Sequence, residues 1–319
     1  MNLKKIVAPV KKEVNDLEIK FANVLTNTVL KENFNNTFLT KGKKIRPIFL
    51  FLLARGLGYM SDDIIDYGII VELLHNASLV HDDIIDHSDK RRGLASFNSI
   101  YSNDIAVLMG DYLFLLANRT ALDKNNIRLL KTISEHNERL LLGEILEGFN
   151  SFRIDISEQE YMSIIKDKTA SLFELVGDVT SILIDADTRL GNKLTELGSM
   201  IGLSFQIIDD ILDYKADKTR MGKPVMNDLV EGTITLPLIY SMKNSPELKQ
   251  LIKHYFKTKD KRLYEEIRDK IEKFGGFEYS NQIVKGYMMK AKEVISSFKD
   301  SVYTDALNQL FDFIIKRAF

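Results

Sequence analysis

Apolar residues recur at intervals of three and four along most of this sequence, and this spacing constrains the fold more than any other feature. Near the N-terminus the interval runs through Val14, Leu17 and Phe21, and it returns in the middle of the chain at Leu129 and Ile133. Spacing of this kind collects apolar side chains on one face of an α-helix. Only 5 prolines and 17 glycines interrupt the 319 residues. The sequence therefore predicts an all-α fold with roughly ten or more helices.

The composition bounds the size of the fold and the class of its partners. With 45% hydrophobic residues the chain can form a large core, and its net charge of −1 gives no general attraction to nucleic acid or to anionic membranes. No linker rich in proline, glycine or serine and no repeat of solenoid period divides it, so we predict a single domain over residues 1–319. The chain has no cysteine, which excludes disulfides, thiolate catalysis and zinc–thiolate sites.

The location of the protein is predicted from the features that its sequence lacks. The N-terminal residues carry lysines but not the sustained apolar stretch of a secretory signal. No uninterrupted apolar run approaches the ~18 residues of a membrane span, and the longest obvious one covers residues 48–54. We therefore expect a cytoplasmic protein without a transmembrane segment.

The strongest indication of chemistry lies within residues 72–93. Asp82, Asp83 and Asp86 stand at i, i+1 and i+4, so the first and last carboxylates share one helix face and can reach one cation together. Oxygen ligands alone suit Mg²⁺, which keeps coordination positions open for water and substrate phosphate. A basic cluster that suits such phosphates follows: Lys90, Arg91 and Arg92. For one pentad alone, a solvated surface of mixed charge explains the pattern equally well.

Two further copies of this pentad occur, and their surroundings distinguish them. The copy that begins at Asp209 ends an apolar helical pattern and is followed by lysines. The copy that begins at Asp62 follows Ser61, an N-cap residue, and no basic cluster comes after it. We interpret the Asp62 copy as capping and surface residues. The copies at Asp82 and Asp209 predict two walls of one cavity that binds a diphosphate through several Mg²⁺ ions.

Smaller motifs point to further phosphate contacts. Residues 41–47 form a loop with one glycine and four cations before a helix, where a phosphate can bind; an ordinary solvated loop is the alternative. His75 and His81 lie six residues apart, about 120° around a helix, so they do not form a metal pair. Lys168 and Thr169 interrupt an apolar helical pattern and are candidate phosphate contacts or surface residues.

Taken in order, these motifs resemble those of the trans-isoprenyl diphosphate synthases, the polyprenyl synthetase family. The matching segments are GKKIRP, HNASLVHDDIIDHSDKRRG, AVLMGDYL, GEILEG, KTASLF, GLSFQIIDDILDY, GKPVMNDL and TLPL. The resemblance implies an all-α bundle around a deep central cavity, the isoprenoid synthase fold. It also implies a Mg²⁺-dependent prenyltransferase that condenses isopentenyl diphosphate with farnesyl or geranyl diphosphate and forms a homodimer.

The activity implied by this resemblance is a Mg²⁺-dependent transfer of prenyl groups, and each matching residue receives a role from it. About three Mg²⁺ ions are implied, with these metal ligands: Asp82, Asp83, Asp86, Asp209, Asp210 and Asp213. Contacts to the allylic diphosphate fall on Arg91, Lys168, Thr169, Gln206 and Lys223. Contacts to isopentenyl diphosphate fall on Lys43, Arg46, His75 and Arg92. Catalysis is carried by Lys168 together with Asp82, Asp83, Asp86, Asp209 and Asp210.

Four positions depart from the pattern of the family. Lys41 replaces the first glycine of the GGKRxRP loop, and Lys44 replaces its arginine. Thr233 stands where EGKxTLP has a lysine, and Glu147 stands where GExxQ has an amide. The basic loop keeps its charge, whereas Thr233 leaves one expected cation missing.

Product length is predicted from the helix that carries Asp82. The prenyl tail is expected to run toward the N-terminus of this helix, past Ala77 and Ser78, just over one turn away. Both residues are small, and in the family an aromatic residue at these positions closes the cavity at farnesyl length. We therefore expect a hexaprenyl to octaprenyl product for a quinone side chain.

Other functions fit parts of the sequence. A geranylgeranyl diphosphate synthase differs from the predicted enzyme mainly in the depth of its cavity. This function therefore remains an alternative. A class I terpene cyclase is disfavoured by the second complete pentad and by the isopentenyl diphosphate residues. A non-catalytic subunit of a heteromeric synthase is disfavoured because such subunits typically lose aspartates from one pentad, and both are whole here.

Overall fold

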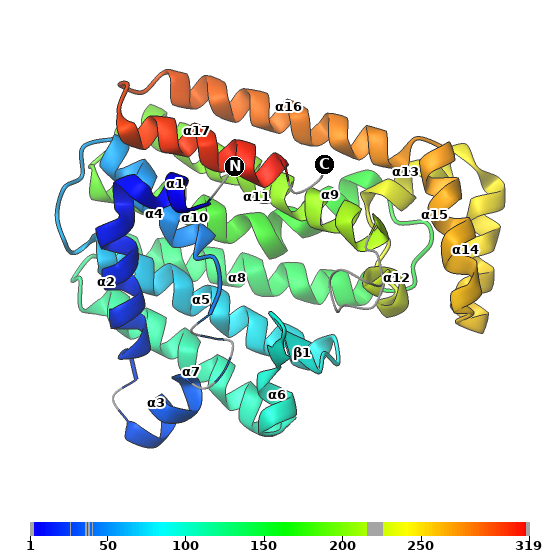
Figure 1. The fold of residues 1–319 in the computed structure, drawn as a ribbon, viewed down its shortest axis with the longest axis horizontal. Helices are drawn as coiled ribbons and strands as arrows, with labels where there is room; N and C mark the ends of the chain where they lie inside the picture. The colour runs from blue at the N-terminus through cyan, green and yellow to red at the C-terminus, as the bar shows by residue number, and fades with distance from the viewer. Residues whose placement is uncertain are drawn as a thin grey trace. The chain divides into compact units, whose positions relative to one another are not determined.

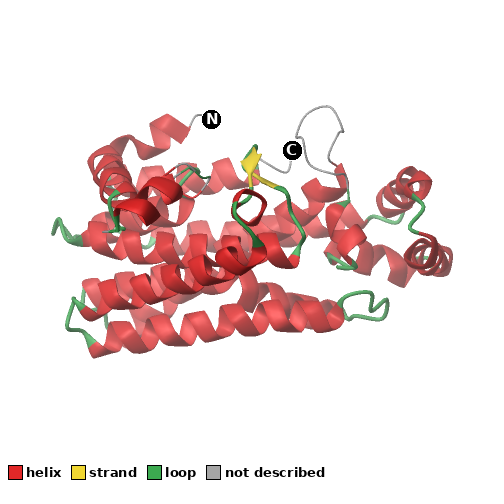
Figure 2. Ribbon diagram, turned by 90° about the horizontal axis from the view of Figure 1, so that it is seen from below, coloured by secondary structure: helices red, strands yellow, loops and turns green. Residues whose placement is uncertain are grey.

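The computed structural model describes residues 3–25, 27–35, 37, 39, 41–215 and 226–316. Most of them are helical (Figure 2), which confirms the predicted all-α class with more than ten helices. The chain forms two compact units. Unit 1 comprises residues 1–137, 172–196 and 295–310, and unit 2 comprises residues 138–171, 197–294 and 311–319. A single domain over residues 1–319 stays a prediction.

The elements divide between the two units. Unit 1 alone contains α1 (Leu3–Val7), η1 (Ala8–Val10), α2 (Lys11–Ala22), α3 (Thr28–Asn35), α4 (Ile45–Gly56), α5 (Ile64–Ile85), β1 (Lys90–Arg91), β2 (Leu94–Ala95), α6 (Phe97–Ile100) and α7 (Asn103–Leu122). Unit 2 alone contains α9 (Glu158–Ile165), η3 (Lys166–Ala170), α12 (Asn227–Glu231), α13 (Leu236–Asn244), α14 (Pro246–Thr258), η4 (Lys261–Leu263) and α15 (Tyr264–Lys273). Helices with residues in both units are α8 (Ile127–Asn150), α10 (Ser171–Leu183), α11 (Thr188–Lys215), α16 (Gly276–Ser296) and α17 (Val302–Ile315).

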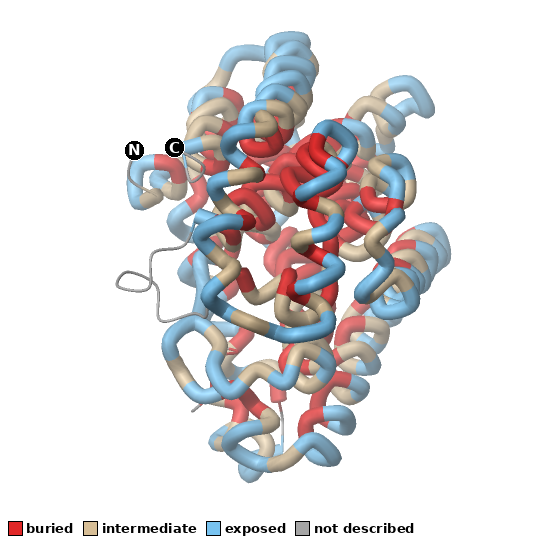
Figure 3. The backbone as a smooth tube through the Cα atoms, turned by 90° about the vertical axis from the view of Figure 1, so that its right-hand side faces the viewer, coloured by how far each residue is buried: buried red, intermediate tan, exposed pale blue. Residues whose placement is uncertain are grey.

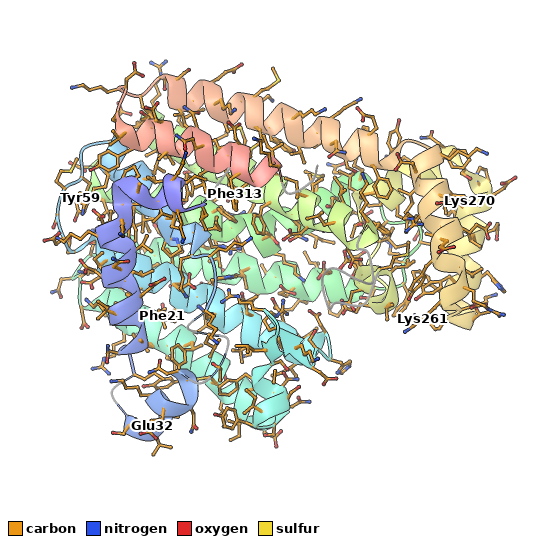
Figure 4. All side chains as sticks on the ribbon, in the orientation of Figure 1. Phe21, Glu32, Tyr59, Lys261, Lys270 and Phe313 are labelled. Atoms are coloured by element: carbon orange, nitrogen blue, oxygen red, sulfur yellow. The ribbon has the colours of Figure 1, made fainter. Side chains whose placement is uncertain are left out.

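The centre of unit 1 is α5, which runs alongside α7 (Figure 1). Most of α5 is buried because its sequence is apolar around nearly the whole helix. In Figure 3 the buried stretches are red and the exposed ones pale blue. Phe21 of α2 (Figure 4) packs against Phe34 of α3, with ring centroids 5.4 Å apart. A buried helix of this kind gives the aspartates at its C-terminal end a rigid support.

The Asp62 copy of the pentad is structural, in agreement with its interpretation from the sequence. Asp62 pairs with Lys12 of α2 at 3.0 Å, and Tyr59 donates a hydrogen bond to Asp63 at 2.6 Å. Asp66 pairs with Lys20 of α2 and with Lys124, which follows α7. The helix begins at Ile64 with Asp63 as its N-cap residue, and because the Asp63 side chain makes no capping hydrogen bond, the predicted surface role agrees with the structure and the predicted capping role does not. The carboxylates of this copy therefore fix neighbouring elements of unit 1 to one another.

Unit 2 contains a break in helical geometry at the position that the sequence indicated. After α9, residues Lys166–Ala170 form a π-turn, labelled η3, before α10 begins. Such turns are rare in proteins and occur often at functional sites. In the same unit, Lys270 of α15 (Figure 4) pairs with Glu247 of α14 at 3.3 Å.

One helix among the described residues has the length and composition of a membrane span. This helix is α7, with a mean hydropathy of 1.3 and 33% of the stretch buried. Helices in the core of soluble proteins pass the same test, so the finding has little weight. The absence of a transmembrane segment stays a prediction.

Candidate active site

The first aspartate motif lies at the C-terminal end of α5. Asp82 and Asp83 belong to its last turn, while Asp86 follows directly as the C-cap residue and donates its backbone N–H to the carbonyl of Asp82 at 2.8 Å. Asp83 is fully buried, whereas Asp82 and Asp86 are partly exposed. Negative charges at a helix C-terminus interact unfavourably with the negative end of the helix dipole, so this arrangement needs cations nearby.

Arg91 supplies one of these cations from a short hairpin. Strands β1 and β2 pair Arg91 with Leu94, and the turn between them has positive φ at Arg92 (53°) and Gly93 (75°). Arg91 donates to Asp83 Oδ1 from Nε at 2.6 Å, with Nη2 at 2.5 Å. Burial lowers the pKa of Arg91, but the Asp83 carboxylate outweighs this effect and raises it. The all-helical expectation missed this hairpin, which holds Arg91 against the motif.

A second cationic group surrounds His75, on the same helix. The Arg46 Nη1 atom lies 3.3 Å from His75 Nδ1, and Arg92 Nη2 lies 3.5 Å from His75 Nε2. Burial, then the charges of Arg46 and Arg92, lower the pKa of His75 well below its ordinary value. The imidazole is therefore neutral at pH 7. The structure thus brings together Arg46, His75 and Arg92, with exposed Lys43 on the loop before α4.

A buried ion pair anchors that loop, and the sequence did not reveal it. Lys44 Nζ lies 2.8 Å from Glu72 Oε1, and both side chains are 2% exposed. Asn76 donates to the same Glu72 oxygen at 3.0 Å. Lys44 has a left-handed backbone (φ 51°) at the start of α4. The pair therefore fixes the loop that carries Lys43, and the start of α4 that carries Arg46, to the middle of α5.

Glu72→Gln is expected to lower the free energy of unfolding by about 3–5 kcal/mol, because it leaves the Lys44 ammonium buried without its counter-charge. Chemical denaturation followed by circular dichroism measures this change. Lys12→Met is the control, since it breaks the exposed pair with Asp62 and should leave the stability nearly unchanged. Equal effects of the two substitutions would contradict the anchoring role of Glu72.

The second aspartate motif lies near the C-terminal end of α11, in unit 2. Asp210 is 2% exposed. Its Oδ2 atom accepts a hydrogen bond from Tyr161 at 2.5 Å, and its Oδ1 atom accepts one from Gln206 at 2.7 Å. Thr169 in turn donates to Gln206 Oε1 at 2.7 Å. The structure thus joins three predicted site residues through one network, together with Tyr161, which the sequence analysis missed.

A further carboxylate, that of Asp228, lies near Asp213. Asp213 accepts the backbone N–H groups of Asn227 at 3.0 Å and Asp228 at 3.2 Å, so it holds the start of α12. Burial, followed by the charges of Asp213 and Asp210, raises the pKa of Asp228 well above its ordinary value. Asp209 and Asp213 are partly exposed. In both motifs the middle aspartate is therefore buried and held by protein donors, while the outer two are partly exposed.

Burial raises the pKa of Asp210 to about 7, against the lowering effect of its bonds with Tyr161 and Gln206. In the folded state this group keeps a proton that the unfolded chain loses near pH 4. Its contribution to stability is thus fully present below pH 4 and is lost as the pH rises through about 7. In the absence of divalent metal, we expect Asp210→Asn to reduce the loss of stability between pH 5 and 8 by on the order of 2 kcal/mol.

Denaturation at several pH values in the presence of a chelator measures this difference. Asp155→Asn, which replaces an exposed aspartate of the same unit, is the matched control. The same pH dependence of the free energy of unfolding in wild type and Asp210→Asn would contradict the prediction.

Two predicted site residues need separate comment. Lys168 lies on the π-turn of unit 2, and its Nζ atom is 2.9 Å from Glu144 and closer still to Glu147. Lys223 lies outside the described residues. Within the part of the chain that the structure describes, no three acidic or histidine side chains are grouped closely enough to hold a metal ion by themselves. The metal assignments therefore rest on the chemistry of the motifs and on the family.

Comparison with known proteins decides which family this is. A family model described as Polyprenyl synthetase matches residues 27–273. The chain belongs to the polyprenyl synthetase family. It is 32% identical over 321 residues to the octaprenyl diphosphate synthase of Escherichia coli (strain K12), covering 99% of both chains.

Solved structures of the polyprenyl synthetase family share this fold. A heptaprenyl diphosphate synthase from Staphylococcus aureus is 29% identical, with a TM-score of 0.90 and coverage of 100% of this chain and 99% of the other. A decaprenyl diphosphate synthase from Rhodobacter capsulatus, 24% identical, has a TM-score of 0.92 over the whole of both chains and shows the fold alone. The predicted family, fold class and enzyme class, a trans-prenyltransferase, are confirmed. Members of this family depend on Mg²⁺ and use allylic diphosphates and isopentenyl diphosphate.

Proposed function

We propose that this protein extends an allylic diphosphate by successive head-to-tail condensation with isopentenyl diphosphate, giving an all-trans hexaprenyl to octaprenyl diphosphate for a quinone side chain. The similarity over nearly the full length to an octaprenyl diphosphate synthase carries this proposal. Two complete aspartate motifs, each with a buried middle aspartate and partly exposed outer ones, support it.

The donor chemistry of the two motifs fits Mg²⁺, because every ligand on offer is a hard oxygen. We assign direct metal contacts to the partly exposed carboxylates of Asp82, Asp86, Asp209 and Asp213, for about three ions. Asp83 and Asp210 complete the set of six, and their buried carboxyl groups hold Arg91 and Gln206 in place. Bound Mg²⁺ neutralises the charge that develops on the departing diphosphate.

The cationic group around His75 is assigned to the diphosphate of isopentenyl diphosphate. Arg46 and Arg92 supply permanent charge, and Lys43 lies on the adjoining loop. Neutral His75 has one N–H to donate and adds no repulsion to the two arginines. The allylic diphosphate is assigned to the remaining predicted contacts: Arg91, Lys168, Thr169, Gln206 and Lys223.

The reaction begins when the carbon–oxygen bond of the allylic diphosphate breaks and its electron pair leaves with the diphosphate. The double bond of isopentenyl diphosphate then attacks the allylic carbocation and forms the new carbon–carbon bond. The departed diphosphate, the base that the family resemblance implies, then accepts a proton from the resulting cation, which restores an alkene. Cationic side chains such as Lys168 stabilise the leaving group, since preorganised charge acts where negative charge develops.

A homodimer is part of this proposal, and exposed apolar side chains support it. On α7, Leu108, Leu115 and Leu122 are 62%, 67% and 56% exposed. On α8, Ile145 and Phe149 are 51% and 80% exposed, one turn apart. Exposed apolar side chains that gather on a surface mark sites of protein interaction. Light scattering after gel filtration should give twice the mass of the chain; a monomer would remove this part of the proposal.

Product analysis tests the whole proposal. Purified protein, Mg²⁺, radiolabelled isopentenyl diphosphate and farnesyl diphosphate are incubated together, and the dephosphorylated products are sized by chromatography. Products of hexaprenyl to octaprenyl length are expected. A product that stops at geranylgeranyl length would keep the family and refute the chain length. No condensation at all would favour a non-catalytic subunit.

We also propose a cytoplasmic location, which fractionation of cells tests directly.

A further inference from the structure

The π-turn of unit 2 is pressed against α8. A Cβ atom at Gly143 would lie 2.3 Å from the backbone nitrogen of Lys168, so only glycine allows the two segments to approach this closely. Four residues earlier on α8, Arg139 Nε donates to Asp167 Oδ1 at 2.8 Å. The backbone that carries Lys168 is therefore fixed relative to α8 at two points, the close approach at Gly143 and the ion pair at Arg139.

The Lys168 side chain reaches two carboxylates of α8. Its Nζ atom is 2.9 Å from Glu144, and Glu147 accepts a hydrogen bond from the same ammonium group. The side chains of Lys168, Glu144 and Glu147 are 21%, 15% and 24% exposed, so the group is shielded from water over most of its surface. Together, Lys168, Glu144 and Glu147 have a net negative charge, because one of the two carboxylates is enough to neutralise the Lys168 ammonium group.

The second of these carboxylates, Glu147, departs from the pattern of the family. Glu147 stands where the family motif GExxQ has an amide. This chain therefore places an additional negative charge against Lys168.

We propose that Glu147 competes with the allylic diphosphate for the ammonium group of Lys168 and thereby weakens binding of that substrate. The inference rests on the proposed function, which assigns Lys168 to the allylic diphosphate. Glu147 is a positioning residue, since it acts on the substrate through Lys168. When the diphosphate binds, Lys168 exchanges Glu147 for phosphate oxygens, and the separation of this ion pair opposes binding.

Glu147→Gln removes the charge and keeps the size of the side chain, while Glu144 still holds Lys168 in place. The KM for farnesyl diphosphate is expected to fall by roughly two- to fivefold, as for the loss of a partly exposed ion pair. The kcat and the KM for isopentenyl diphosphate should stay unchanged. Glu138→Gln, an exposed charge change on the same helix, is the matched control and should alter none of these constants.

A double-mutant cycle with Lys168→Gln separates competition from simple repulsion. Its readout is the binding of inorganic pyrophosphate in the presence of Mg²⁺, measured by calorimetry, which needs no catalysis. Glu147→Gln should tighten binding in the wild-type background and have little effect in the Lys168→Gln background. An equal effect in both backgrounds would show that Glu147 repels the anion directly and would overturn the proposal.

Two further results would also overturn it: a higher KM for farnesyl diphosphate in Glu147→Gln, or a lower kcat with an unchanged KM. Thermal unfolding of each variant, followed by circular dichroism, verifies that the compared proteins are folded. Failure of the proposed function has a different signature, because wild type would then form no product, while the pyrophosphate cycle would still report on Glu147 and Lys168.

Discussion

Asp82→Asn is expected to lower kcat for prenyl transfer by about a hundred- to a thousandfold, because it removes one carboxylate charge from the motif at the end of α5. The Mg²⁺ concentration needed for half-maximal rate should rise as well. Initial rates with radiolabelled isopentenyl diphosphate, measured over a range of Mg²⁺ concentrations, give both quantities. The size of the side chain is unchanged, so the effect comes from charge and coordination.

The same chain offers a matched control for this substitution. Asp62→Asn changes the first aspartate of an identical pentad pattern, but at a surface position paired with Lys12. Its kcat and Mg²⁺ dependence should equal those of wild type. Similar losses in both variants, or full activity of Asp82→Asn, would show that the structural context of the pentads has been misread.

Ala77→Phe is expected to shorten the product, with farnesyl diphosphate no longer extended to hexaprenyl length or beyond. Ala77 is fully buried on α5, five residues before Asp82, so a phenyl ring at this position enters the space assigned to the growing chain. The added volume also costs about 1–3 kcal/mol of stability. Chromatography of the dephosphorylated products measures the change in length, and thermal unfolding shows whether the variant is folded.

Ala77→Ser is the control at the same position, since it adds only one atom. Its neighbour Ser78 shows how this helix accommodates a hydroxyl group: the side chain donates to the carbonyl of His75 at 2.9 Å. The product of Ala77→Ser should match that of wild type. A folded, active Ala77→Phe variant with products of unchanged length would place the path of the prenyl chain elsewhere.

Features that depend on local sequence were predictable. Apolar spacing indicated the helices, and the neighbours of each pentad separated the surface copy at Asp62 from the copy at Asp82. The break in helical geometry at Lys168 and Thr169 was also visible, because polar residues there interrupt an apolar pattern. Each of these inferences uses residues within a few turns of one another, where side-chain direction follows from the helical repeat.

Contacts between distant residues were not predictable by the same reasoning. Tyr161 and Asp210 are 49 positions apart, and Lys44 and Glu72 are 28 apart. Neither pair has a local pattern, because the partners meet only through the packing of separate helices. The hairpin at Arg91 was missed for a different reason: its two-residue strands are too short to show alternation.

The π-turn at residues 166–170 makes chain length itself a constraint on this region. A π-turn corresponds to one residue inserted into an α-helix. Deletion of one residue there would restore an ordinary α-helical turn and leave α9 and α10 in about their present orientation, but the widened turn that carries Lys168 would be lost. Lys168 would then no longer meet its present partners on α8 in the same geometry. Insertions and deletions in this short segment should therefore be far rarer among functional variants than substitutions.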